Sequence, residues 1–291
     1  MFRGSIPALV TLFRDGAFDE AAYSDFVAWQ VAEGSHGLVP CGTTGESATL
    51  TDGEHRRAIE IAVEAAAGAV PVIAGCGSND TAHAIELTRS AKEAGADAAL
   101  HVPPYYNRPN QEGIYAHLAA IAEAVDMPIV LYNVPARTVT DIAVETMARL
   151  SKVANVVAVK DATGNLARVS AQRLACGEDF VQLSGNDDMA LGFMAMGGQG
   201  CISVTANIAP RLCADFQNAC FSGDWQTALK LQDRLYPLHA ALFTDASPGP
   251  VKYALSRVRA TSAELRLPMT PPSEASRRAV DSALRHAGLT V

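Results

Sequence analysis

A lysine stands at the end of an apolar run in the segment VVAVKDATGN, residues 156–165. The four residues before it are apolar and mostly β-branched, which predicts a strand buried on both faces, as in a parallel sheet. Lysine is rarely buried unless it is paired or functional. Lys160 therefore either caps a strand at the surface or places an amine in a cavity.

An amine in a cavity suits Schiff-base chemistry. Lysine side chains with an ordinary pKa of about 10.4 are protonated at neutral pH, and desolvation can bring such a pKa down to roughly 7–8. The unprotonated amine condenses with a ketone to give an iminium, which withdraws electrons and stabilises a carbanion on the neighbouring carbon.

Further reactive side chains follow other apolar runs. They are Thr43 and Thr44 in GTTGES (42–47), Tyr105 and Tyr106 in PPYYN (103–107), Tyr132 and Arg137 in YNVPART (132–138), and Asp187 and Asp188 in SGNDD (184–188). Each has an ordinary structural interpretation as well: half-buried or interface aromatics, a turn with a helix cap, a surface ion pair, and aspartates that cap the helix after the run 180–185. Their occurrence at the ends of successive apolar runs favours one shared site.

Eight short apolar runs alternate with helical patterns and predict the strands. The runs are 5–13, 37–42, 71–77, 98–106, 128–135, 156–163, 180–185 and 200–207. Eight such strand–helix units predict a (β/α)₈ TIM barrel, whose active site lies at the C-terminal ends of the strands. A doubly wound open sheet is the alternative, but no G-x-G-x-x-G follows the first run.

The alternation stops after Ala209. The patterns 210–223, 224–243, 248–258 and 272–288 all predict helices, and the first of these would close the barrel. We therefore expect a barrel over residues 1–222 and a C-terminal helical region over 223–291. Earlier in the chain, Thr51 and Glu54 have the spacing of a capping box at the start of a helix.

Composition narrows the function classes. The chain has 291 residues, 49% of them hydrophobic, and a net charge of −8 without basic clusters, so we expect no nucleic-acid or membrane partner. Six cysteines without a C-x-x-C pair indicate a reducing compartment, and we expect a cytoplasmic protein. Because the histidines are dispersed and no Cys/His metal spacing occurs, we expect neither a metal nor another cofactor.

Taken together, the motifs resemble those of the dihydrodipicolinate synthase family. They are GTTGES, PPYYNRP (103–109), YNVPART, VKDATGN (159–165) and LSGNDD (183–188), continued by CISVTAN (201–207) and LRLPMTP (265–271). The resemblance covers essentially the whole chain in order. It implies a class I aldolase-type lyase of the N-acetylneuraminate lyase-like superfamily, which condenses pyruvate with L-aspartate 4-semialdehyde to 4-hydroxy-tetrahydrodipicolinate in lysine and diaminopimelate biosynthesis.

The resemblance also implies roles for individual residues. Lys160 would form the iminium with pyruvate, and Tyr132 would act as acid and base, linked through Thr43 to Tyr106 of an adjoining subunit. Backbone N–H groups around Thr43 and Thr44 would hold the pyruvate carboxylate. Arg137 would bind the carboxylate of the semialdehyde, and Gly185 and Ile202 would line the pocket. The family forms homotetramers built from dimers, so we expect a homo-oligomer.

A regulatory site is also implied, because many relatives are inhibited by lysine at a cleft between subunits. The matching residues here are Ser47, Ala48, His55, Asn79, His83 and Tyr105. His83 replaces a family acid that receives the ammonium group of the inhibitor, and we expect Asp52 to face water. A neutral histidine supplies no negative charge, so we predict weak or absent inhibition by lysine.

Three other functions are less well supported. N-acetylneuraminate lyase generally has Ser-Thr where this chain has Thr43-Thr44, and it lacks an arginine that matches Arg137. A catalytically silent barrel would have lost at least one of the relay residues, yet all are present. A phosphate-binding barrel would need a glycine-rich phosphate loop after the seventh run, and none is evident.

Overall fold

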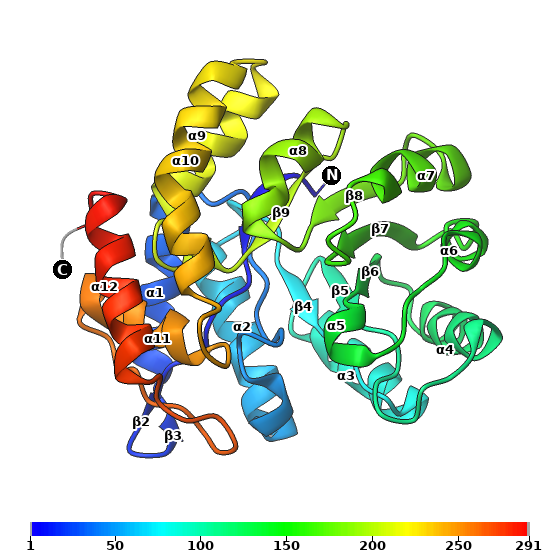
Figure 1. Cartoon of the computed structure of the whole chain (residues 1–291). Helices are drawn as coiled ribbons and strands as arrows, with labels where there is room; N and C mark the ends of the chain where they lie inside the picture. Colours follow the sequence, from blue (N-terminus) through cyan, green and yellow to red (C-terminus); the bar gives the residue numbers. More distant parts are fainter. Residues whose placement is uncertain (1, 290–291) are drawn as a thin grey trace.

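The computed structural model describes residues 2–289, in which helices surround a curled parallel sheet (Figure 1). Seven strands hydrogen-bond in the order β1-β9-β8-β7-β6-β5-β4. They are β1 (Gly4–Pro7), β4 (Ile73–Gly75), β5 (Ala98–His101), β6 (Ile129–Asn133), β7 (Val156–Asp161), β8 (Val181–Ser184) and β9 (Gly200–Ser203). Each overlaps one of the predicted runs, and the (β/α)₈ barrel is confirmed.

The predicted second strand, residues 37–42, makes one short bridge to each neighbour, with five backbone hydrogen bonds of 2.8–2.9 Å. Val39 bridges to Ala8 beyond β1, and Leu38 bridges to Val72 before β4, so this segment closes the gap between the two ends of the sheet order. Pro40 has no N–H to donate to a ladder, and Cys41 has a φ of 56°. The pairing therefore stops just before the turn GTTGES.

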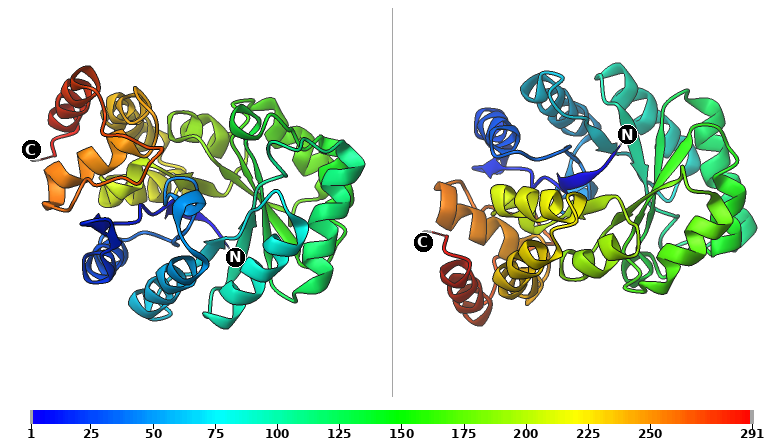
Figure 2. Two further views of the ribbon diagram at one scale, coloured as in Figure 1. Left: turned by 90° about the horizontal axis from the view of Figure 1, so that it is seen from below. Right: turned by 90° about the horizontal axis from the view of Figure 1, so that it is seen from above.

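The helices lie outside the sheet (Figure 2). Around the barrel these are α1 (Glu20–Ala32), α2 (Asp52–Ala66), α3 (Thr81–Glu93), α4 (Gln111–Ala124), α6 (Val144–Leu150), α7 (Ala167–Cys176), α8 (Ala190–Ala195) and α9 (Pro210–Phe221). Short helical turns follow several strands: η1 (Ser47–Thr49), α5 (Pro135–Thr138), η2 (Asp187–Met189) and η3 (Thr205–Asn207). The capping box predicted for α2 is confirmed, since Thr51 and Glu54 bond reciprocally.

The C-terminal helices are α10 (Trp225–Ala241), α11 (Gly249–Arg259) and α12 (Glu274–His286), as predicted. The segment between α11 and α12 reaches the N-terminal part of the chain, where Glu264 Oε1 accepts the N–H of Gly16 at 2.6 Å. The division into a barrel over residues 1–222 and a helical region over 223–291 stays a prediction.

One element was not predicted. β2 (Phe13–Arg14) and β3 (Ala17–Phe18) form a small antiparallel hairpin, whereas the run 5–13 was interpreted as a single strand. Asp15 and Gly16, with φ values of 54° and 79°, make the two-residue turn. An Asp-Gly pair between short apolar stretches is the sequence signal for such a hairpin.

Side-chain alternation divides the barrel interior from the helix layer. In β6, Val130 and Tyr132 pack inside the barrel together with Ala158 of β7, whereas Leu131 packs in the outer cluster. Since strand side chains alternate between faces, Lys160 shares the inner face with Ala158 and Asp161 turns toward the helices. The register pairs Tyr132 with Lys160.

Candidate active site

A cavity of about 420 Å³ opens where the barrel strands end. Its walls come from the turn 42–47, from β6 and β7, from the loops after β8 and β9, and from Phe243 and Ser247 of the C-terminal region. The predicted residues that line it are Thr43, Thr44, Ser47, Tyr132, Arg137, Lys160 and Gly185. Side chains from distant parts of the sequence thus meet in one cavity, at the end of the barrel predicted to be catalytic.

Lys160 is not a surface cap of its strand. The residue is 6% exposed, and its Nζ lies 4.1 Å from the centroid of the Tyr132 ring. Among residues 2–289 no carboxylate lies within ion-pair distance of this amine, whereas the other buried lysine, Lys252, pairs with Glu46. The geometry therefore places an amine against a phenol inside the cavity, and the catalytic role of Lys160 stays a prediction.

The turn 42–47 presents unused backbone donors. The N–H of Glu46 donates to the carbonyl of Thr43 at 3.1 Å, and the N–H of Gly45 donates to the carbonyl of Gly42. In the described part of the chain, the N–H groups of Thr43 and Thr44 have no protein acceptor. Two adjacent N–H groups without acceptors, in residues that line a cavity, can bind an anion such as a carboxylate.

Arg137 lies in α5 directly after β6, where it is exposed and lines the cavity. The surface ion pair considered from the sequence is not found, because no carboxylate of residues 2–289 contacts this guanidinium. Arg137 is thus available to a ligand, and its planar fork matches a carboxylate.

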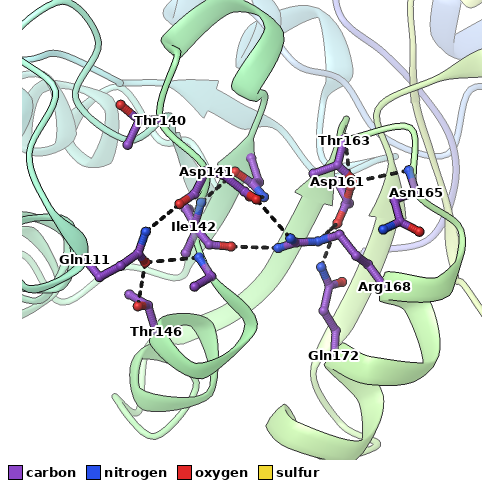
Figure 3. Close-up of polar contacts among 12 residues, drawn as sticks. Gln111, Thr140, Asp141, Ile142, Thr146, Asp161, Thr163, Asn165, Arg168 and Gln172 are labelled. Atoms are coloured by element: carbon purple, nitrogen blue, oxygen red, sulfur yellow. Dashed lines mark hydrogen bonds and ion pairs between the residues drawn. The ribbon is translucent and has the colours of Figure 1, made fainter.

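A polar network behind the cavity holds the ends of β6 and β7, and we call it the Arg168 clamp. It consists of Gln111, Asn133, Asp141, Asp161, Arg168 and Gln172. Figure 3 labels all of these residues except Asn133. Asp161, next to Lys160, contacts Arg168 Nε at 3.3 Å and accepts from Gln172 Nε2 at 2.6 Å. These residues were not predicted from the sequence, although Asp161 directly follows Lys160 at the end of a buried strand.

The same clamp fixes the loop after α5. Arg168 donates to the carbonyl of Ile142 at 2.7 Å and to Asp141 Oδ2 at 3.3 Å. Asn133, directly after Tyr132, donates to Asp141 Oδ1 at 2.7 Å. Gln111 of α4 supports the loop from the other side through the carbonyl of Asp141 (Figure 3). The strand ends that carry Lys160 and Tyr132 are therefore tied to the loop that follows Arg137.

Gly185 and Ile202 differ in position. Gly185 lines the cavity and donates its N–H to the carbonyl of Asp161 at 2.7 Å, and an added Cβ would lie 2.7 Å from the Cβ of Ala162. Ile202 does not line the cavity. It is fully buried in the barrel-interior cluster that includes Tyr132 and supports the cavity floor.

The expectation that Asp187 caps the helix after β8 is wrong. Asn186 occupies the capping position of η2 and makes no side-chain bond. The Asp187 carboxylate is buried and accepts instead from the N–H groups of Val204 and Thr205, at 2.8 and 3.2 Å. These donors at the start of η3 are buried and need an acceptor, so Asp187 joins the loop after β8 to the loop after β9.

The two adjacent tyrosines do not line the cavity of their own chain. Tyr106 is 91% exposed with a φ of 69°, and Tyr105 is 39% exposed. A non-glycine residue at positive φ is strained, so the backbone is bent there to project the ring outward. Within residues 2–289 no hydrogen bond joins Tyr106 to Thr43 or Tyr132.

The candidate regulatory residues surround the turn and the start of α3. His55 is buried and bonds to the carbonyl of Gly75 at 2.7 Å, and burial lowers its pKa. His83 Nε2 lies 3.3 Å from Asp52 Oδ1, and the Asp52 side chain is 80% exposed, facing water as expected. Ser47 lines the cavity, Ala48 is exposed and Asn79 is half-buried.

Comparisons with known proteins decide the family. The model of the dihydrodipicolinate synthetase family matches residues 1–287. The chain belongs to the dihydrodipicolinate synthetase family. A 4-hydroxy-tetrahydrodipicolinate synthase from Rhizorhabdus wittichii is 66% identical over 290 residues, which are 99% of this chain and all of the relative.

Solved structures from the same family have the same fold. Dihydrodipicolinate synthase from Aquifex aeolicus superposes with a TM-score of 0.97 at 42% identity, covering 100% of this chain and 99% of that one. The chloride-inhibited enzyme from Acinetobacter baumannii, complexed with pyruvate, gives a TM-score of 0.96 at 42% identity, over 99% of this chain and 100% of that one.

Two further observations concern membranes and metal ions. No helix between residues 2 and 289 is long and apolar enough to cross a membrane. The same range contains no group of three or more His, Cys, Asp or Glu residues arranged to hold a metal ion.

Proposed function

We propose that this chain is a Schiff-base-forming synthase that condenses pyruvate with L-aspartate 4-semialdehyde to give 4-hydroxy-tetrahydrodipicolinate, in lysine and diaminopimelate biosynthesis. The observation that carries the proposal is the buried Lys160 amine in a cavity that also holds unused N–H groups and the unpaired Arg137. The names of the relatives, and pyruvate in a neighbour's crystal, support these substrates.

The residues of the cavity account for each chemical step. The Lys160 amine adds to the ketone carbon of pyruvate, and loss of water gives the iminium. Loss of a methyl proton gives an enamine, whose carbon attacks the aldehyde of the second substrate. The amino group of that substrate then displaces Lys160 from the former ketone carbon and closes the ring. One water is released overall, and no electrons are lost or gained.

Tyr132 lies against the amine and is the candidate that carries these protons. In the proposed relay its hydroxyl connects through Thr43 to Tyr106 of another subunit. Tyr106 is exposed and is not among the residues that line the cavity of its own chain, and both facts support a relay completed by a second copy of the chain. We therefore propose a homo-oligomer, a tetramer built from dimers, in which an isolated monomer is poorly active.

The carboxylates of the two substrates would bind at different sites. The N–H groups of Thr43 and Thr44 suit pyruvate because they lie in a turn beside the amine. Arg137 suits the semialdehyde because it lies at the exposed mouth. We expect the enzyme to act in the cytoplasm, where its six cysteines, all free in the structure, stay reduced.

We further propose that lysine inhibits this enzyme weakly or not at all, through Ser47, Ala48, His55, Asn79, His83 and Tyr105. His83 supplies no negative charge to an ammonium ion. His83→Glu should therefore strengthen inhibition in steady-state assays, whereas half-inhibition of the unaltered enzyme at low micromolar lysine would contradict the proposal. The exposed Glu86→Gln, one turn along α3, is the matched control.

Borohydride trapping tests the main proposal. Borohydride with pyruvate should inactivate the enzyme and add one reduced pyruvate to the peptide that contains Lys160. Lys160→Arg should lose nearly all trapping, since a guanidinium is not deprotonated at working pH. Product formation from both substrates, followed through a coupled reductase, checks the overall reaction. Labelling of another lysine would overturn the assignment.

A further inference from the structure

A second buried lysine lies close to the cavity but outside it. Lys252 of α11 is 0% exposed, and its Nζ makes an ion pair with Glu46 Oε1 at 2.5 Å. The ammonium group also donates to the carbonyl of Glu264 at 2.7 Å and lies 4.2 Å from the centroid of the Phe13 ring. The charge is thus fully desolvated and depends on Glu46 for compensation.

Glu46 belongs to the turn that presents the N–H groups of Thr43 and Thr44. Its φ of 54° is strained for a residue with a side chain. Both oxygens of its carboxylate are held by the C-terminal region, one by Lys252 and the other by the N–H of Arg266 at 3.1 Å. The turn is therefore anchored in a conformation that it would not adopt by itself.

The ion pair also neutralises the negative charge that Glu46 brings to the turn. An uncompensated carboxylate beside two N–H groups would oppose the binding of any anion, and in a site without water this repulsion is strong. Lys252 neutralises that carboxylate without entering the cavity, since Lys252 is not among the cavity-lining residues. The electrostatic potential at the N–H groups of Thr43 and Thr44 then favours the binding of an anion.

We propose that Lys252 is a positioning residue for the pyruvate carboxylate: through Glu46 it fixes and neutralises the turn that binds this group. The inference rests on the proposed function, in which Thr43 and Thr44 receive pyruvate. It assigns the C-terminal helical region a part in substrate binding, although α11 contributes no side chain to the chemistry.

Trapping with two ketones tests the inference. Pyruvate and acetone both form an iminium with an amine, but only pyruvate carries a carboxylate. In Lys252→Met, the pyruvate concentration for half-maximal borohydride trapping at Lys160 should rise about tenfold, as expected for a slightly displaced binding group. Trapping by acetone should stay within about twofold of the unaltered enzyme. Lys230→Met, an exposed lysine of α10, is the matched control and should change neither.

A double variant protects the test from misfolding. Glu46→Gln with Lys252→Met leaves no unpaired buried charge, and the amide oxygen that replaces the carboxylate can still accept the N–H of Arg266. In this double variant the pyruvate concentration for half-maximal trapping should rise by about threefold. This is less than in Lys252→Met, because the effects of coupled residues are non-additive. If Lys252→Met does not fold, the double variant alone tests the inference. Half-maximal trapping at the same pyruvate concentration as in the unaltered enzyme would then overturn it.

The outcomes separate this inference from the proposed function. If the unaltered enzyme traps pyruvate no better than acetone, the turn has no carboxylate role and the proposed function of Thr43 and Thr44 is wrong. If the unaltered enzyme prefers pyruvate but Lys252→Met keeps the same preference, only the role of Lys252 is wrong. An equal loss for both ketones would reduce Lys252 to a structural role and would also overturn the inference.

Discussion

The two sides of the cavity are held by different kinds of interaction. On one side, the Arg168 clamp spreads its hydrogen bonds over several side chains and backbone groups around Asp141 and Asp161. On the other side, the charge of Glu46 in the turn 42–47 is balanced by one desolvated ion pair with Lys252, and the N–H of Arg266 holds the other carboxylate oxygen. Loss of one bond from a distributed network leaves the others in place, whereas loss of one member of a buried pair leaves an uncompensated charge.

The backbone behind each side explains the difference. β6 and β7 are ladder neighbours over their whole length, so the Arg168 clamp has only to fix their ends. The turn 42–47 lies beyond the sheet bonds of its own segment, the last of which joins the N–H of Gly75 to the carbonyl of Pro40 at 2.9 Å. A distant helix therefore supplies the anchor. Where the sheet bonding ends, the chain holds the turn with electrostatics from outside the barrel.

The largest expected effect separates the two sides by substrate. Arg137→Ala should lower kcat/KM for the semialdehyde by about 2–4 kcal/mol of transition-state stabilisation, because a charged partner of a carboxylate is lost. Pyruvate should still trap on Lys160 at unchanged concentration, since the turn is untouched. Steady-state kinetics in both substrates measure this, and an equal loss of pyruvate trapping would contradict the division of roles.

Breaking the Arg168 clamp at its centre should have the next largest effect. Arg168→Leu should lower the free energy of unfolding by about 3 kcal/mol, because Asp161 loses its cation in a mostly buried site. It should also lower kcat about tenfold, with little change in the KM for pyruvate, because Lys160 and Tyr132 are misplaced rather than the turn. Denaturant unfolding and kinetics test both parts. Arg173→Leu, five residues further along α7 and bonded to the carbonyl of Met196, is the control.

Alkaline pH should weaken the side of the cavity formed by the turn 42–47 and not the side held by the Arg168 clamp. Burial lowers the pKa of Lys252 from 10.5 to about 8, against the opposing effect of Glu46. Above this pKa the folded protein loses the proton while the unfolded chain keeps it up to about pH 10.5, so this group makes stability rise, not fall, with pH. Glu46 is then unpaired, and the KM for pyruvate should increase a few fold, or about 1 kcal/mol, between pH 8 and 9.5.

The variant Lys252→Met isolates that effect. Its KM for pyruvate should already be high at pH 7.5 and should show no additional rise attributable to Lys252 above pH 8. Parallel profiles in the unaltered enzyme and in Lys252→Met would mean that another group causes the change, and the role of Lys252 would be wrong.

The smallest expected effect lies at the edge of the Arg168 clamp. Gln111→Ala removes bonds to the carbonyl of Asp141, to the N–H of Ala143 and to Thr146. Gln111 is exposed, and Arg168 still holds the loop, so we expect at most about 1 kcal/mol of destabilisation and less than a twofold change in kcat. A loss as large as that of Arg168→Leu would mean that the clamp is not distributed.

Local sequence patterns predicted the barrel and most of the cavity wall. Buried parallel strands such as β7 are continuous apolar runs, and reactive residues at their ends must meet in a barrel, so Lys160, Tyr132 and Arg137 could be identified without coordinates. The hairpin β2–β3 was missed because its Asp-Gly signal sits at the end of a longer apolar run.

The anchors could not be predicted in the same way. Glu46 and Arg266 contact each other across 220 residues of sequence, and no periodicity relates such positions. Lys252 stands three residues before Leu255 on the buried face of α11, which hints at burial but does not name a partner. Asp187 likewise binds a neighbouring loop rather than its own helix, because unpaired donors there compete for it.

The dependence of Glu46 on Lys252 also orders events during protein synthesis. A ribosome adds about 5–20 residues per second, so Lys252 leaves it roughly 10 to 40 seconds after Glu46. Until then the Glu46 carboxylate has no buried partner and stays in water, and Gly4 of β1 still lacks its neighbour Gly200 for most of that interval. We expect the turn 42–47 to be among the last parts of the barrel to become native, so that a nascent chain has no complete cavity before its C-terminal helices have been made.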